Sequence, residues 1–160
     1  MDLAERAGTA LDKVYLRLRH PEAFGVASGE QGSFDSLRGH KYALLVTFRR
    51  DGRAVPTPTW FGVGDEGNVY TRTLAQAGKV KRVRNNSRSL LAPCTVRGRP
   101  LGQAIEGRAR VLPREEWDRA EQAIQANYGL GRRIYELPTR GENEAMTYLE
   151  IMALDAATER

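Results

Sequence analysis

The chain has 160 residues, of which 41% are hydrophobic and 28% are charged, and its net charge is +5. This size and composition predict one globular domain with a core of its own. No apolar run approaches the roughly 20 residues that cross a bilayer, so we expect no membrane partner. The single cysteine, Cys94, excludes an intrachain disulfide and a cysteine-based metal site. The N-terminal segment lacks the apolar core of a signal peptide, and we therefore expect a cytoplasmic protein.

The predicted elements begin with a helix over residues 3–19, where apolar residues recur at helical spacing. His20 and Pro21 end this helix, and a loop rich in Gly and Ser follows over 21–33. Residues 34–39 are predicted to form a short helical turn before the first strand. We expect an N-terminal helix and loop extension, a main domain and a tail, which span 1–33, 34–154 and 155–160.

From residue 42 the apolar pattern changes to that of strands. Residues 42–48 are almost continuously apolar, as in a strand covered on both faces, and Asp51-Gly52 predicts a hairpin turn after them. The returning strand carries Pro56 and Pro58, which cannot donate to a ladder, so we expect it to lie at an edge or to contain a bulge. Six strands are predicted, over 42–48, 55–63, 68–73, 90–96, 103–112 and 147–154.

Three more helices are predicted, over 77–88, 113–129 and 130–137. The second of them starts at Pro113 and places Trp117, Ala120, Ile124 and Tyr128 on one apolar face. Six strands with tight hairpins and a few peripheral helices predict a mainly β fold, a small antiparallel barrel. Such a barrel buries one face of the strand over 42–48, so a second subunit or a covering helix must bury the other.

A block without counter-charge lies between Glu66 and Glu106, where the chain has no acidic residue. It contains Arg72, Lys79, Lys81, Arg82, Arg84, Arg88, Arg97 and Arg99. The densest part falls on the predicted helix over 77–88, and a helix N-terminus adds free N–H groups and its dipole to such charge. We therefore expect this helix to bind an anion. A nucleotide-like cofactor and a nucleic acid are both possible sources of that anion.

Three short pieces of sequence, over 55–61, 70–73 and 78–82, form the strongest constellation. A short connection joins the last two, so Arg72 and Thr73 at a strand end can sit beside Lys79 at a helix start. A guanidinium, a hydroxyl and an ammonium that converge there would hold a phosphate. The proline-broken piece leaves backbone groups free for a flat polar heterocycle. An ordinary hairpin followed by a solvated basic helix would explain the same residues without a ligand.

Four motifs occur in order, L-R-G-H-K-Y over 37–42, P-T-P-T-W-F over 56–61, G-K-V-K-R over 78–82 and L-A-P-C over 91–94. With them, the chain from about 34 to 151 resembles the pyridoxamine-phosphate-oxidase-like (PPOX class) split-barrel family. Within this family it resembles the branch of deazaflavin (coenzyme F-420) dependent oxidoreductases. The resemblance implies a six-stranded antiparallel split β-barrel, the FMN-binding split barrel, with peripheral helices. It also implies a homodimer with two cofactors in grooves between its subunits, and makes 34–154 the cofactor-binding domain.

The resemblance also implies which residues bind the cofactor. Its phosphate contacts fall on Arg72, Thr73, Lys79 and Arg82, with Lys81 assisting, and its ring-facing segment falls on Thr57, Pro58, Thr59 and Trp60. Neighbouring helix positions point about 100° apart, so Lys79 and Lys81 cannot both face one phosphate squarely. Coenzyme F-420 carries several carboxylates beyond its phosphate. Arg84, Arg88 and Arg99 could meet these carboxylates, or they could be ordinary surface arginines.

The function that the resemblance implies is that of an enzyme, which transfers hydride between coenzyme F-420 and a small organic substrate. The alternatives are an FMN-binding oxidoreductase, a non-catalytic flavin- or deazaflavin-binding protein of the same fold, and a nucleic-acid-binding module. The basic block has few aromatic residues to stack bases, so we expect no nucleic-acid partner. No catalytic residue is assigned: His40 could be a proton donor near the ring, but a histidine at a strand edge is more often structural, and Cys94 has no His partner nearby in the sequence. No metal site is assigned, because His20, Glu22 and Asp35 are too few and too scattered to form one.

Overall fold

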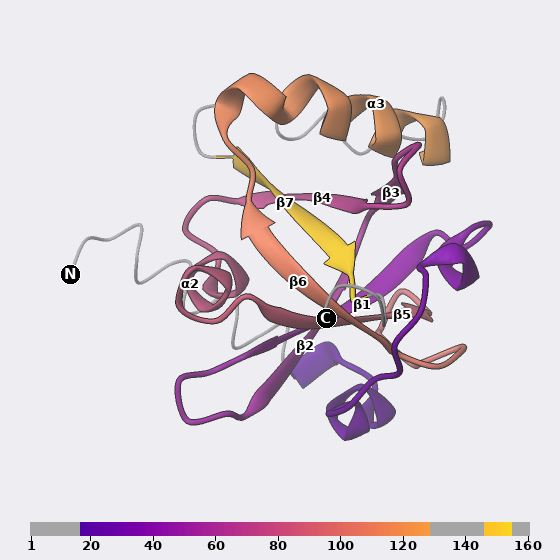
Figure 1. Ribbon diagram of the computed structural model, residues 1–160. Helices are drawn as coiled ribbons and strands as arrows, with labels where there is room; N and C mark the ends of the chain where they lie inside the picture. The colour runs from indigo at the N-terminus through magenta and orange to yellow at the C-terminus, as the bar shows by residue number, and fades with distance from the viewer. Residues whose placement is uncertain (1–16, 129–145, 155–160) are drawn as a thin grey trace.

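The computed structural model describes residues 17–128 and 146–154, which form one curled antiparallel sheet with two helices packed on it (Figure 1). The strands are β1 (Tyr42–Phe48), β2 (Ala54–Thr59), β3 (Gly62–Val63), β4 (Val69–Leu74), β5 (Arg88–Cys94), β6 (Ile105–Val111) and β7 (Met146–Ala153). The α-helices are α2 (Gly78–Asn85) and α3 (Trp117–Tyr128), and the 3-10 turns are η1 (Pro21–Gly25), η2 (Asp35–Leu37) and η3 (Arg114–Glu116).

The strands follow one another across the sheet in the order β2-β1-β5-β6-β7-β4-β3, and all neighbours are antiparallel. Although β2 and β4 are not ladder neighbours, the Thr59 and Thr71 hydroxyls form a hydrogen bond of 2.5 Å. The curl therefore brings the two ends of the sheet together, as in a split barrel. The prediction of a mainly β, antiparallel split barrel with peripheral helices is confirmed.

The prediction of six strands was one short, because the returning strand over 55–63 breaks at Trp60 and Phe61. Its first part, β2, pairs with β1, and its second part, β3, pairs with β4. A Cβ atom on Gly62 would lie 2.2 Å from the carbonyl carbon of Ala123 in α3. Glycine is therefore required where α3 crosses β3.

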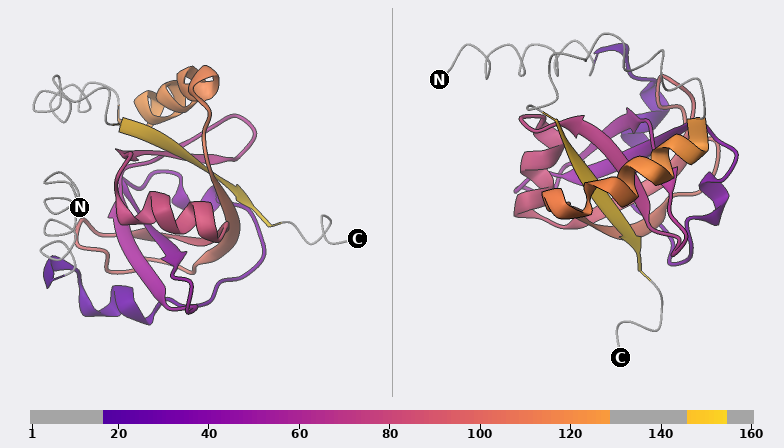
Figure 2. Two further views of the ribbon diagram at one scale, coloured as in Figure 1. Left: turned by 90° about the vertical axis from the view of Figure 1, so that its left-hand side faces the viewer. Right: turned by 90° about the horizontal axis from the view of Figure 1, so that it is seen from above.

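The main core fills the inside of the curled sheet, and it includes Val80 and Val83 of α2. Figure 2 shows α2 packed against the curled sheet. On the outside, Leu44 and Val46 of β1 have no exposed surface and pack with Ala23 of η1. The chain thus covers this outer face with its own residues. The apolar pattern of β1 therefore does not by itself require a second subunit, and part of the cover is the 3-10 turn η1, which lies in the segment predicted as a loop over 21–33.

Several local predictions are confirmed. β1 has the predicted bounds, and η2 lies within the turn expected over 34–39. The Asp51-Gly52 turn also forms, with φ of Gly52 at +87°. β2 lies at an edge of the sheet, as its prolines predict.

Two differences have local causes. The predicted loop over 21–33 begins with η1, since Pro21 suits the first position of a helical turn and Nδ1 of His20 accepts the N–H of Glu22. α2 ends three residues early, because Asn86 has extended backbone and its side chain accepts the N–H of Arg88, which begins β5. The helix predicted over 130–137, and most of that over 3–19, lie outside the described residues.

Candidate functional site

The basic helix α2 packs one face into the barrel and turns its charges outward. Val80 and Val83 are buried in the core, whereas Lys79 is half-buried and Lys81 is exposed. Nε of Arg82 donates to the hydroxyl of Thr47, a buried residue of β1, at 2.7 Å. No side chain caps the N-terminus of α2 at Ala77, and its first turn has no acidic residue. These features suit an anion at the start of the helix.

Arg72 and Thr73, which the sequence predicts to contact one phosphate, lie on opposite faces of β4. Thr73 pairs with Thr147, and it lies on the same side of the strand as Val69, which packs with α2 in the core. Arg72 pairs with Tyr148 on the opposite side, where the outer cluster under α3 lies. Successive strand residues point to opposite faces, so within this chain only Thr73 lies on the α2 side.

The expected ring-facing segment also divides between two faces. Thr57 and Thr59 pair with the inward-facing Leu45 and Ala43 of β1, whereas Pro58 pairs with Leu44 on the outer face. The other edge of β2 has no strand beside it in the described sheet. Proline has no N–H and occurs in strands where no ladder donor is needed. We therefore infer that Pro58 presents its carbonyl, and no N–H, at this free edge.

Trp60 is held by an aromatic cluster at the strand break. Its ring lies 4.2 Å from the ring of Tyr128 at the end of α3, and 6.0 Å edge-on from that of Tyr42. The Tyr128 hydroxyl accepts the N–H of Phe61 at 2.9 Å and donates to the carbonyl of Lys41. These contacts fix the indole of Trp60 where β2 ends. Burial of the Tyr128 hydroxyl raises its pKa to about 12.

Asn127 completes this latch, which we define as Asn127 and Tyr128. Its Nδ2 donates to the carbonyl of Phe61 at 3.0 Å. The latch therefore gives hydrogen-bond partners to both the N–H and the carbonyl of Phe61, where the sheet is interrupted. Sequence reasoning placed Tyr128 on an apolar helix face and did not consider Asn127. The sequence does contain a signal for this latch, because Asn127 and Tyr128 are adjacent polar residues at the end of a helix whose core-facing side is otherwise apolar.

A groove of about 450 Å³ lies between the β1–β2 turn and α2. It is lined by Phe48, Arg49, Arg50, Asp51, Arg53, Gly78, Lys81, Arg82 and Asn85. Of the residues predicted for phosphate binding, Lys81 and Arg82 line this groove. The three turn arginines were not predicted, although Arg-Arg-Asp-Gly-Arg at a hairpin turn is visible in the sequence.

Two further arginines of the acid-free block, Arg88 and Arg99, lie outside α2. Arg88 makes an ion pair of 2.6 Å with Glu106 and lies 4.3 Å over the Phe48 ring. Arg99 lies in the turn that follows β5, at the opposite end of this strand from α2. Arg84 is exposed on α2 itself. Of the three arginines considered for the carboxylates of coenzyme F-420, only Arg84 therefore lies on α2.

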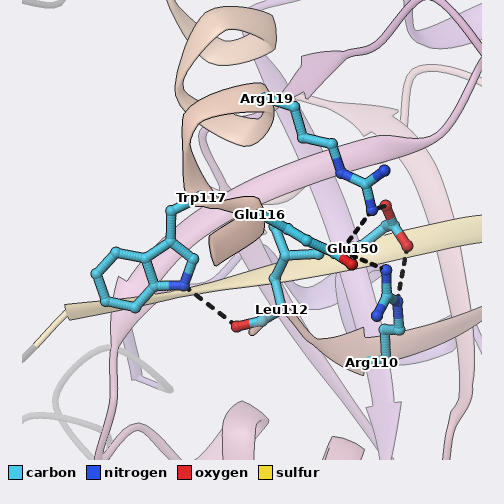
Figure 3. Close-up of polar contacts among 6 residues, drawn as sticks. All are labelled: Arg110, Leu112, Glu116, Trp117, Arg119 and Glu150. Atoms are coloured by element: carbon cyan, nitrogen blue, oxygen red, sulfur yellow. Dashed lines mark hydrogen bonds and ion pairs between the residues drawn. The ribbon is translucent and has the colours of Figure 1, made fainter. Parts of the chain in front are cut away.

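A buried carboxylate ties α3 to the outer face of the sheet (Figure 3). Glu150 of β7 is 2% exposed and accepts from Arg110 at 2.8 Å and from Arg119 at 2.9 Å. Both arginines also bind Glu116, so β6, β7, η3 and α3 share one network. Burial, followed by the hydrogen bond to Glu150, raises the pKa of Tyr70 to about 12. This network positions the helix that carries the latch.

Other candidate groups offer little chemistry. Cys94 is buried, and burial raises its thiol pKa to about 12, which keeps it protonated and unreactive at neutral pH. Across residues 17–128 and 146–154, no three His, Cys, Asp or Glu side chains gather as metal ligands would. None of the helices in this part of the chain has the length and apolarity to cross a membrane.

Solved structures share this fold at low sequence identity. The heme storage protein HutZ from Vibrio cholerae aligns with a TM-score of 0.57 and 13% identity, over 76% of this chain and 87% of its own. An FAD-binding protein from Mesorhizobium loti aligns with 0.55 and 15%, over 75% and 86%. The conserved hypothetical protein Rv2991 from Mycobacterium tuberculosis aligns with 0.54 and 19%, over 74% and 76%. These likenesses show the fold alone.

Comparison with curated proteins gives no match. The profile described as pyridoxamine 5'-phosphate oxidase matches residues 33–156, which is most of the chain. This match confirms the broader resemblance seen in the sequence and indicates a flavin-binding, oxidoreductase-type function. The chain, with its curled antiparallel sheet and basic helix, belongs to the pyridoxamine 5'-phosphate oxidase family.

Proposed function

We propose that this protein is an oxidoreductase that uses the deazaflavin coenzyme F-420 and a small organic substrate. The observation that carries the proposal is helix α2, which has four cationic side chains, no acid and an uncapped N-terminus at the end of β4. This is more positive charge than one phosphate requires. It suits a cofactor whose phosphate is followed by carboxylates.

The residues present fit such a cofactor in two places. Lys79, Arg82 and Thr73 would hold the phosphate around the start of α2, and Lys81 would add charge beside them. The β2 edge, from Thr57 to Trp60, would lie along the ring system. When bound, the deazaflavin supplies hydride transfer itself.

The protein's part in the reaction is to bind and to orient. The latch fixes Trp60 through ring contact, and the network around Glu150 fixes the helix that carries the latch. The proton of the reaction can come from water, so this proposal assigns no acid or base to a side chain. We also propose that the protein is a homodimer, for which light scattering should give twice the 17.9 kDa of the chain.

FMN is the alternative cofactor, because family membership indicates flavin binding and one fold neighbour is an FAD-binding protein. The same phosphate site would serve it. A non-catalytic role is a further alternative, since another neighbour is a heme storage protein. Both alternatives keep α2 as the anion site, but FMN ends at its phosphate and has none of the carboxylates that follow the phosphate of coenzyme F-420.

The test of the site compares two single charge removals. Lys79→Ala should weaken cofactor binding by about 1.5–3 kcal/mol, the scale of a charge-assisted hydrogen bond, or roughly ten- to hundred-fold in Kd. Arg114→Ala removes an exposed charge on η3 and should change the Kd less than twofold. Equal small effects of the two substitutions would mean that α2 does not hold the phosphate.

A further inference from the structure

We propose that Thr47 is a positioning residue, whose hydroxyl fixes the direction of the Arg82 guanidinium for the phosphate of the cofactor. This role rests on the proposed function, in which Arg82 holds that phosphate around the start of α2. Thr47 lies in β1, has no exposed surface and is not among the residues that the sequence predicts for the site. It therefore acts on the cofactor through Arg82, without touching the cofactor itself.

A hydroxyl is out of keeping with its surroundings in β1. Every residue from Ala43 to Phe48 is buried, and Thr47 is the one with a polar side chain. A buried hydroxyl costs free energy unless it is hydrogen-bonded, whereas a valine side chain has nearly the same volume and no such cost. The hydroxyl of Thr47 therefore needs a partner, and the helix α2 supplies it.

That partner is a guanidinium whose plane decides what it can bind. Nε of Arg82 donates to Oγ1 of Thr47 at 2.7 Å, across 35 positions of the chain. The N–H groups of a guanidinium form a rigid planar fork, so a bond to Nε fixes the plane of the whole group. Because an oxyanion makes its strongest contact in that plane, this bond determines whether Arg82 can hold a phosphate with two hydrogen bonds.

The helix that carries Arg82 is held as well. Val80 and Val83 of α2 pack in the core, so the backbone of the helix is fixed against the barrel. Lys79 and Lys81 carry ammonium groups on flexible stems, and such groups act as point charges with no preferred plane. Arg82 is thus the cation of α2 that is oriented through a buried residue, and a side chain that is oriented before the ligand arrives loses less entropy on binding.

Ser89 provides a matched control for Thr47. It lies opposite Thr47 on β5, and it also has no exposed surface. Its Oγ has no hydrogen-bond partner among residues 17–128 and 146–154. Ser89→Ala therefore removes an equally buried hydroxyl from a neighbouring strand and leaves the bond to Arg82 in place. Thr47→Val removes the hydroxyl that Arg82 uses, and Thr47→Ser keeps it.

The test measures Kd for the full chain by fluorescence titration at fixed ionic strength, with two pairs of ligands. Each pair compares a phosphate-bearing ligand with its phosphate-free form: FMN with riboflavin, and coenzyme F-420 with its deazariboflavin core. The ratio of the two Kd values in a pair measures what the phosphate side contributes. A general loss of structure would weaken both members of a pair and leave this ratio unchanged. The use of both pairs separates the role of Thr47 from the identity of the cofactor.

In the wild type we expect the phosphate-bearing ligand to bind at least about tenfold more tightly than its phosphate-free form in one pair or both. Thr47→Val should lower that ratio about fivefold or more, whereas Thr47→Ser and Ser89→Ala should each keep it within about twofold of the wild type. Thr47→Ala removes the same hydroxyl and should act as Thr47→Val does. An unchanged ratio in Thr47→Val, or an equal loss in Ser89→Ala, would overturn the role of Thr47 and leave the phosphate site on α2 intact. A wild-type ratio near one in both pairs would overturn the phosphate site and the role of Thr47 together.

Discussion

Tyr128→Phe tests the latch most cleanly, because it removes one oxygen and keeps the ring on Trp60. The lost hydroxyl accepts the N–H of Phe61 and donates to the carbonyl of Lys41. Phe61 has no exposed surface, so water cannot replace this acceptor. Lys41 is exposed, so its carbonyl can bond to water instead. A buried N–H without an acceptor costs about 1–3 kcal/mol, and we therefore expect a loss of about 2 kcal/mol.

For a chain of this size that loss lowers Tm by about 4–8 °C, which scanning calorimetry resolves easily. Gln125→Ala, an exposed change on the same helix, should stay within about 0.5 kcal/mol of the wild type. If Tyr128→Phe also stayed within that limit, the hydroxyl would not be satisfying Phe61. This hydroxyl would then not tie α3 to the strand break.

Further predictions concern the same outer face. Gly62→Ala should cost about 3 kcal/mol or more, seen as a lower Tm or as misfolding, because its Cβ would overlap the backbone of α3. Glu150→Ala should cost about 3 kcal/mol in urea unfolding, since it removes a buried carboxylate from two arginines that are partly exposed and can be rehydrated. Tyr70 and Tyr128 have folded pKa values of about 12 against 10.0 unfolded, so stability should be constant up to about pH 9 and fall toward pH 12. Tyr70→Phe should make that alkaline fall shallower.

The sequence predicted those parts of the fold that local rules determine. Asp51-Gly52 requires a tight turn, and Pro56 and Pro58 confine their strand to an edge, so both features could be read without a structure. Successive strand residues also point to opposite faces, so the opposite directions of Arg72 and Thr73 could have been predicted from their adjacent positions in a strand. That part of the site was predictable.

The rest depends on contacts between residues far apart in the chain. Arg88 meets Glu106 because β5 and β6 pair in a particular register, and no local pattern states that register. The hydrogen bond from Asn127 to Phe61 likewise joins segments that only the curled sheet brings together. Counting the arginines of the acid-free block therefore could not show that Arg88 is paired with Glu106.

Fluorescence titration of the purified protein with coenzyme F-420 and with FMN, under identical conditions, distinguishes the proposed deazaflavin from a flavin. We expect clearly tighter binding of coenzyme F-420, because the cations along α2 exceed the needs of one phosphate. We also expect Lys79→Ala to weaken this binding and Arg114→Ala to leave it unchanged. Equal or tighter binding of FMN would make this protein an FMN-binding member of the family and not a deazaflavin-dependent one.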